Sequence, residues 1–205
     1  MNIYCDRSNY TNSEAAVAAF QQMGTNGITF LVESLGRGDN VWSRRWSPWI
    51  FTHAPMAVAQ RLPEPHHADI LAYTSQILLD QLTMERRDPT PERTFARLLK
   101  LFRLHDDYRR EWVASIVWRY TETYPQLDLI PFRAELIRAL NDDYLGVRIY
   151  IANSSPVAKL VGPELVRSSL TPYLTSSDPA LRIPAEEVLA QAGFTNVALD
   201  RTNAP

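Results

Sequence analysis

Pairs of adjacent carboxylates are the side chains in this sequence that most resemble a catalytic group. Asp106-Asp107, Asp142-Asp143 and Glu186-Glu187 are adjacent acids, and two carboxylates can share general acid and base work. The first two pairs, however, are each followed by tyrosine and lie 36 residues apart, and Asp178 lies 35 residues after Asp143. Recurrence at a fixed spacing indicates structural turns of a repeat, so we interpret these acids as structural.

Other catalytic and metal-binding patterns are missing from the sequence. It contains no Gly-x-Ser-x-Gly, no glycine-rich phosphate loop and no His-Glu-x-x-His, and Cys5 has no base close to it in sequence. His66, His67 and Asp69 lack the i, i+4 spacing that places two ligands on one helix face. We therefore expect no enzymatic activity, no cofactor and no metal site.

An arginine follows each of the three recurring aspartates within three to five residues: Arg110, Arg148 and Arg182. An aspartate in a turn can cap the next helix and oppose the positive end of its dipole. The arginine, one turn into that helix, can then bond the aspartate or the turn before it. One helix pair of this length cannot cover its own apolar stripe, so the pattern predicts stacked helix pairs.

These turns resemble those of a known repeat family. Asp178-Pro-Ala-Leu-Arg182 resembles the turn between the two helices of a HEAT-like repeat, and Leu160-Val-Gly162-Pro163 resembles the join between repeats. Met23-Gly24-Thr25-Asn26 is similar to that join in bacterial members. The resemblance implies an all-α fold, an α-solenoid of about five stacked antiparallel helix pairs, and most often a binding scaffold.

The pattern of apolar residues divides the chain into an N-terminal arm (1–12), a single helical domain (13–193) that the resemblance implies is HEAT-like, and a C-terminal tail (194–205). Helical spacing of apolar residues predicts the buried face of each helix. After a helix that ends at Gly24, a second is capped by Thr25 or Asn26 and buries Ile28, Leu31, Val32 and Leu35. A helix over 68–84 is expected to turn inward Ile70, Leu71, Tyr73, Ile77, Leu78 and Leu82. Further helices are expected from Pro91 (burying Phe95, Leu98, Leu99 and Phe102), over 109–124 and over 178–192.

Trp42, Trp46 and Trp49 have the i, i+4, i+7 spacing of one helix face. Two interpretations stay open, a buried aromatic seam between repeats and an exposed surface that anchors a partner together with Arg45.

Five arginines occupy similar places in the repeat. Arg97 and Arg133 each lie ten residues before the recurring aspartate of their unit, and Arg167 lies eleven residues before its own. Arg103 lies four residues before its aspartate, and Arg138 lies five residues before its own. We place them on the second helix of each unit, which in HEAT-like solenoids lines the concave face. Together with Arg45 and Trp46 they are the candidate partner-binding residues, able to bind carboxylates or phosphates in a forked geometry. The alternative is a solvated face with local ion pairs, such as Glu92 with Arg97 or Glu135 with Arg138.

Bulk composition bounds the class of protein. Of 205 residues, 45% are hydrophobic and 21% charged, enough to bury a core. The net charge of −2 argues against broad binding to nucleic acid or membrane surfaces. A single cysteine excludes an internal disulfide framework, and the first residues lack a basic and apolar leader, so we expect a cytoplasmic protein.

The function that follows is a non-catalytic protein–protein interaction module that binds an acidic partner surface on its concave face. It could be a scaffold, an adaptor or an immunity-type inhibitor. The alternative, implied by the same resemblance, is a HEAT-like DNA glycosylase or another nucleic-acid-binding repeat protein, in which Trp42, Trp46 and Arg45 would act. A weaker third option is the chromophore-lyase branch of the family.

Overall fold

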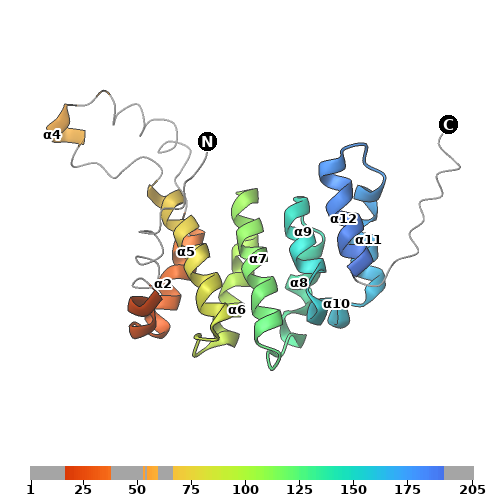
Figure 1. The fold of residues 1–205 in the computed structure, drawn as a ribbon, viewed down its shortest axis with the longest axis horizontal. Helices are drawn as coiled ribbons and strands as arrows, with labels where there is room; N and C mark the ends of the chain where they lie inside the picture. The colour runs from red at the N-terminus through yellow and green to blue at the C-terminus, as the bar shows by residue number, and fades with distance from the viewer. Residues whose placement is uncertain (1–16, 38–52, 54, 60–66, 192–205) are drawn as a thin grey trace, which may run out of the picture. The chain divides into compact units, whose positions relative to one another are not determined.

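The computed structural model describes residues 17–37, 53, 55–59 and 67–191, and every regular element among them is a helix. This confirms the predicted all-α class for the described chain. After a helical segment at 17–22, the elements are α2 (Thr25–Gly36), α4 (Met56–Ala59), α5 (His67–Met84), α6 (Pro91–Lys100), η1 (Leu101–Arg103), α7 (Asp107–Thr123), η2 (Ile130–Phe132), α8 (Arg133–Leu140), α9 (Leu145–Ala152), α10 (Ser155–Val161), α11 (Pro163–Leu174) and α12 (Pro179–Gln191) (Figure 1). The chain forms two compact units, Met1–Arg97 and Leu98–Pro205. The predicted arm (1–12) and tail (194–205) lie outside the described residues.

In the first unit α2 packs against α5. The predicted stripe of α2 is confirmed, because its four members are all buried: Ile28, Leu31, Val32 and Leu35. Gly24 precedes the helix with a φ of +55°, a conformation that favours glycine, and occupies the N-cap position without a side-chain hydrogen bond. The predicted cap by Thr25 or Asn26 is therefore wrong, since Thr25 is already the first residue of the helix.

The inward face predicted for α5 is only partly correct. Ile70, Tyr73 and Ile77 are 54%, 53% and 43% exposed, whereas Leu78 and Leu82 are buried as predicted. The buried face is completed by Ala72, Ser75, Leu79 and Thr83. Helix α5 has apolar residues on two sides, and the side that it buries contains small residues at its start. Hydrophobicity alone therefore selects the wrong side for the first half of the helix.

Helix α6 begins at Pro91, where proline is tolerated because a first-turn N–H has no helical acceptor. Three members of its predicted apolar stripe, Phe95, Leu98 and Leu99, are buried as predicted, and the fourth, Phe102, is buried in η1 after the end of α6.

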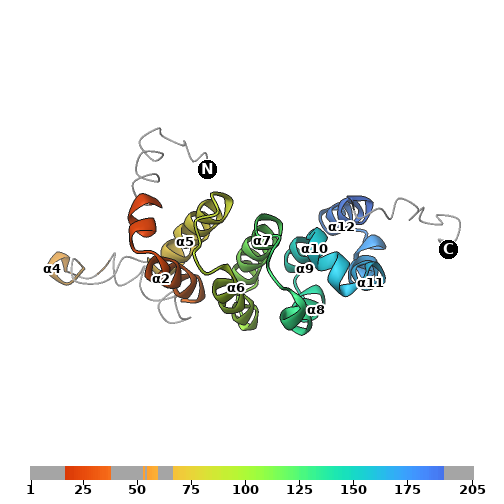
Figure 2. The same ribbon diagram turned by 90° about the horizontal axis from the view of Figure 1, so that it is seen from below.

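The second unit has two layers of helices. Helices α8 and α11 lie in one layer and α7, α9 and α12 in the other, as Figure 2 shows. Neighbours across the layers pack as α8 with α9 and α11 with α12, while α9 also packs against α7 and α12. Leu136 and Leu170, one from each helix of the first layer, are fully buried, as is Val117 in the other.

Arginines of α7, α9 and α12 in the second unit each donate a hydrogen bond to a backbone carbonyl of the turn before their helix. Arg110 Nη1 donates to the carbonyl oxygen of Leu104 at 2.9 Å, and Arg182 Nη1 donates to that of Ser176 at 3.2 Å. Arg148 Nε donates to the carbonyl oxygen of Asp142. In each case the acceptor lies six residues before the arginine, in the turn that leads into its helix. The prediction that these arginines bond the preceding turn is confirmed.

Helix α10 is an element that the sequence analysis does not predict. The Ser154 hydroxyl caps it by accepting from the Val157 amide at 3.2 Å, and Pro156 lies in its first turn. The helix ends at Gly162, whose φ of +95° favours glycine, and Pro163 begins α11 directly afterwards. Helix α10 contacts α7, α8, α9 and α11, so it fills the space beside the α8–α9 hairpin.

Among the described residues, no helix has both the length and the apolar composition needed to cross a bilayer.

Candidate binding sites

The predicted arginines lie on the helices that precede the acidic turns. Arg97 belongs to α6, Arg133 and Arg138 to α8, and Arg167 to α11, while Arg103 belongs to η1. Their assignment to the second helix of each unit is therefore wrong. The acidic turn joins the two helices of a hairpin, so a residue ten positions before it lies on the first helix. Arg45 and Trp46, like Trp42 and Trp49, lie outside the described residues.

Four of these arginines are exposed, and their guanidinium groups form no hydrogen bond or ion pair with any described residue: Arg103, Arg133, Arg138 and Arg167. Arg97 differs, because it is half-buried and its Nη1 donates to the Thr29 hydroxyl at 2.5 Å. The local ion pairs considered as an alternative, Glu92 with Arg97 and Glu135 with Arg138, are not formed. The charge of the four exposed arginines is thus left available to solvent or a partner.

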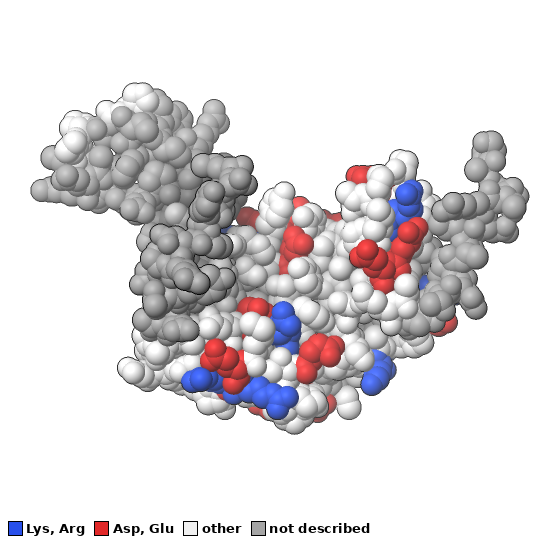
Figure 3. Space-filling model, in the orientation of Figure 1, with Lys and Arg blue, Asp and Glu red and all other residues white. Residues whose placement is uncertain are grey.

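Basic and acidic side chains are interspersed on the face of the described chain that Figure 3 shows. That face carries no continuous band of a single sign.

The recurring acidic tripeptides meet around one buried arginine. Arg110 donates from Nε and Nη2 to the two carboxylate oxygens of Asp142, both at 2.9 Å, and its Nη2 lies 2.6 Å from Asp143 and 3.0 Å from Asp107. The side chains of Arg110 and Asp142 are only 7% and 10% exposed. The hydrogen bonds that Arg110 donates to Asp142 raise the pKa of Arg110, although burial alone would lower it. Asp142 is therefore held in a buried ion pair, whereas Asp107 and Asp143 are exposed at its edge.

Glu111 and Tyr144 lie beside this cluster. The Tyr144 ring meets the Tyr108 ring edge-on, with centroids 6.0 Å apart. Burial raises the pKa of Glu111, and a hydrogen bond with Tyr144 partly offsets that rise. A side chain at Gly146 would bring its Cβ within 2.6 Å of the Glu111 carboxyl carbon, so glycine makes room for this acid.

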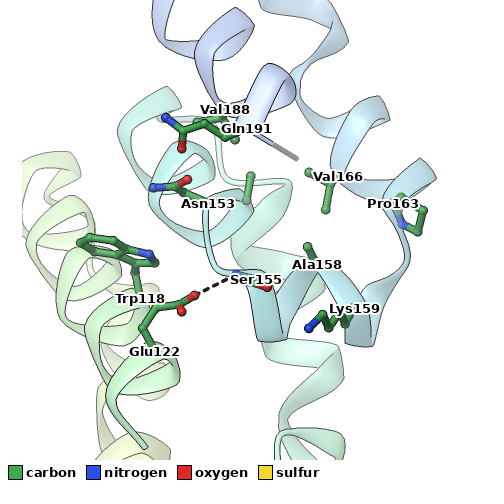
Figure 4. Close-up of a pocket in the computed structure, with 11 residues that line it drawn as sticks. Trp118, Glu122, Asn153, Ser155, Ala158, Lys159, Pro163, Val166, Val188 and Gln191 are labelled. Carbon is green, nitrogen blue, oxygen red and sulfur yellow. Dashed lines mark hydrogen bonds between the residues drawn. The ribbon is translucent and has the colours of Figure 1, made fainter. Parts of the chain in front are cut away.

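A pocket of about 660 Å³ opens in the second unit between α7, the α9–α10 connection, α11 and α12. Its buried lining is aliphatic and small: Ala152, Val166 and Val188. Trp118 and Glu122 project from α7 on one side, and Ala158 and Lys159 of α10 lie across from them (Figure 4).

Two of the groups that line the pocket have their positions fixed by neighbours. Glu122 Oε1 accepts a hydrogen bond from the Ser155 amide at 2.9 Å. The Arg119 guanidinium stacks over the Trp118 indole at 4.6 Å, and the Tyr150 ring centroid is 6.2 Å from that of Trp118.

Three further polar side chains of the pocket have no partner among the described residues: Asn153, Lys159 and Gln191. The pocket therefore combines an aliphatic floor, an aromatic wall and unused hydrogen-bonding groups.

None of the pocket residues was predicted from the sequence. Trp118 and Gln191 are far apart in the chain, so no local spacing links them. The one local signal is Ser154-Ser155-Pro156, a cap followed by a first-turn proline, which is typical of a new helix start. That signal would have predicted α10, and with it the position of Lys159.

No group of three or more His, Cys, Asp or Glu side chains among the described residues is placed to hold a metal ion. Comparison of the chain with family models, with curated proteins and with solved structures finds no match.

Proposed function

We propose that this chain is a HEAT-like α-solenoid that serves as a non-catalytic protein-binding module. In this proposal Arg133, Arg138 and Arg167 bind carboxylates on an acidic partner surface. The observation that carries it is that these three arginines are exposed and without partners on α8 and α11, which share one layer of the second unit.

The repeat part of the proposal is supported by the arginine bond that recurs six residues back in three successive turns. It is further supported by the pairing of α8 with α9 and of α11 with α12, each across an acidic turn. Helices that pair in this way and stack on their neighbours are the units from which solenoids are built.

The binding part is supported by the chemistry of arginine. A guanidinium presents a planar fork of donors that matches a carboxylate and keeps its charge at any physiological pH. An exposed arginine that already had an acidic neighbour would have to break that pair on binding. Arg133, Arg138 and Arg167 have no such pair to break.

A non-catalytic role is supported by the state of the acids. Of the adjacent pairs that could serve as general acid and base, Asp106-Asp107 and Asp142-Asp143 are bound by Arg109 and Arg110. Each pair is thus in contact with an arginine, and Asp142 is also buried.

The test is the double charge reversal Arg133→Glu with Arg167→Glu, used as bait in cross-linking and quantitative mass spectrometry from the native host. We expect the partner captured by the unaltered chain to be lost, since two attractive contacts become repulsive. The matched control is Arg86→Glu with Arg93→Glu, which changes the net charge equally at two exposed arginines outside α8 and α11. Capture that is equal for the two double variants would refute the proposal.

A further inference from the structure

We propose that the pocket between α7, α9–α10, α11 and α12 binds an aliphatic N-acyl amino acid unit through its free carboxylate. This unit occurs in two sources, as a small free acid and as the C-terminal residue of a peptide. The inference goes beyond the proposed function, because none of the arginines assigned to the partner surface lines the pocket.

The size and floor of the pocket suit a small aliphatic group. Its volume of about 660 Å³ falls within the range of about 300–1,000 Å³ that is common for small-molecule sites. Ala152, Val166 and Val188 are buried beneath it, so a side chain such as leucine would lie on apolar atoms. The Trp118 indole on α7 supplies a flat wall next to that floor (Figure 4).

The charge of the ligand follows from Lys159. Its ammonium group is exposed at the pocket and has no partner among the described residues, so it can receive an anion. The opposing charge is that of Glu122, but its Oε1 already accepts from the Ser155 amide. A carboxylate on the Lys159 side and away from Glu122 is the arrangement that satisfies both groups.

The amide of the ligand follows from Asn153 and Gln191. Each side-chain amide can both donate and accept, and neither has a partner among the described residues. Side chains of this kind match the N–H and C=O of a peptide group. An aliphatic side chain, one amide and one carboxylate together define an N-acyl amino acid or a peptide C-terminus.

The first experiment titrates N-acetyl-L-leucine into the full chain and follows the tryptophan indole N–H signals by NMR, with Trp118→Phe to assign its signal. We expect the Trp118 signal to shift with a millimolar Kd, as suits so small a ligand. N-acetyl-L-leucinamide, which lacks the charge, should bind about tenfold more weakly. Equal affinity for the amide, or no shift of the Trp118 signal at roughly 50 mM, a concentration well above a millimolar Kd, overturns the proposal.

Matched variants test the role of each charge. The sequence has only two lysines, so Lys159→Gln is compared with Lys100→Gln, which alters the other exposed lysine outside the pocket. We expect Lys159→Gln to weaken binding about tenfold and Lys100→Gln to leave it unchanged. Glu122→Gln keeps an acceptor for Ser155 and removes a negative charge, so binding should strengthen about two- to threefold. Weaker binding of N-acetyl-L-leucine to the Glu122 variant would mean that the Glu122 carboxylate attracts the ligand, and would also refute the proposal.

A third arm separates the two sources. Acetyl-Gly-Gly-Leu presents the same terminal residue with a longer main chain. Tighter binding of this tripeptide than of N-acetyl-L-leucine assigns the pocket to peptide C-termini, and equal binding assigns it to the free acid. The Arg133→Glu, Arg167→Glu double variant should bind both probes normally, so a failure of the arginine proposal would remain distinguishable.

Discussion

At the scale of single residues, Arg110 links two successive acidic turns of the second unit. It is buried and joins Asp107 of its own helix to Asp142 and Asp143 of the next turn. We expect Arg110→Ala to lower the free energy of unfolding by about 3 kcal/mol, because it leaves Asp142 buried without its partner. Urea denaturation followed by circular dichroism measures this loss.

Asp143→Asn provides the control for that prediction. This carboxylate also contacts Arg110, but its side chain is 89% exposed, so water replaces the lost interaction. Its unfolding curve should almost coincide with that of the unaltered chain. A loss of stability as large as that of Arg110→Ala would contradict the expectation that the exposed contact between Asp143 and Arg110 contributes little to stability.

Glu111 predicts a dependence of stability on pH. Burial raises the pKa of this carboxyl group in the folded chain above its ordinary value. At pH values between the ordinary pKa of the unfolded chain and the raised pKa of the folded chain, the folded state binds more protons at Glu111 than the unfolded state does. The free energy of unfolding contributed by Glu111 is therefore greatest at low pH and is lost as pH rises through the interval.

Urea titrations of the unaltered chain and of Glu111→Gln, at several values from about pH 4 to pH 7, isolate this contribution. The glutamine variant keeps a hydrogen-bonding partner for Tyr144 and removes the titration. We expect the stability of the variant to rise relative to the unaltered chain as pH increases, and then to level off. A difference that is constant across the range would contradict the assignment.

At the scale of elements, Leu170 tests whether α11 is held by its buried face. The side chain is completely buried in the second unit. Leu170→Ala should cost roughly 2–5 kcal/mol, since it removes apolar contacts and leaves a cavity. Ile183→Ala on α12 is the control, because that side chain is 46% exposed. Similar losses of unfolding free energy for the two variants in urea denaturation would argue that the face of α11 that contains Leu170 is not its buried face.

The helices also show what a sequence can and cannot predict. The stripe of α2 was predicted correctly because its large aliphatic residues repeat on one side only. For α5 the prediction failed in part, since Tyr73 and Ile77 compete with a buried side that includes Ala72 and Ser75. Close approach of two helices favours small residues at the contact. A prediction from the spacing of large hydrophobic residues does not detect them.

At the scale of the whole molecule, the modest net charge of −2 leads to a prediction about nucleic acid. Affinity for DNA depends largely on contacts to phosphates, and it rises as salt is lowered. We expect no binding of a duplex oligonucleotide to the full chain in low salt, measured by fluorescence anisotropy. Salt-sensitive binding would instead favour the DNA glycosylase alternative.

Long-range placement limits what the sequence could predict about the sites. The arginines of α8 and α11 were identified from their spacing, but their helix within each hairpin was misassigned. The pocket requires α7 and α12 to approach the same connection after α9, and no local pattern encodes that approach. Its chemistry therefore became apparent only with the structure, whereas the turns around Arg110 and Arg182 were apparent from the repeat.

The contact between Arg110 and Asp142 has a consequence for how this chain could be shortened or recombined. The arginine belongs to one hairpin and takes its principal acid from the next. A fragment that stops before Asp142 would lose both carboxylates of the next turn and would keep only Asp107 as the counter-charge of this arginine. The segments that carry Arg110 and Asp142 should therefore be kept together whenever the chain is truncated or recombined.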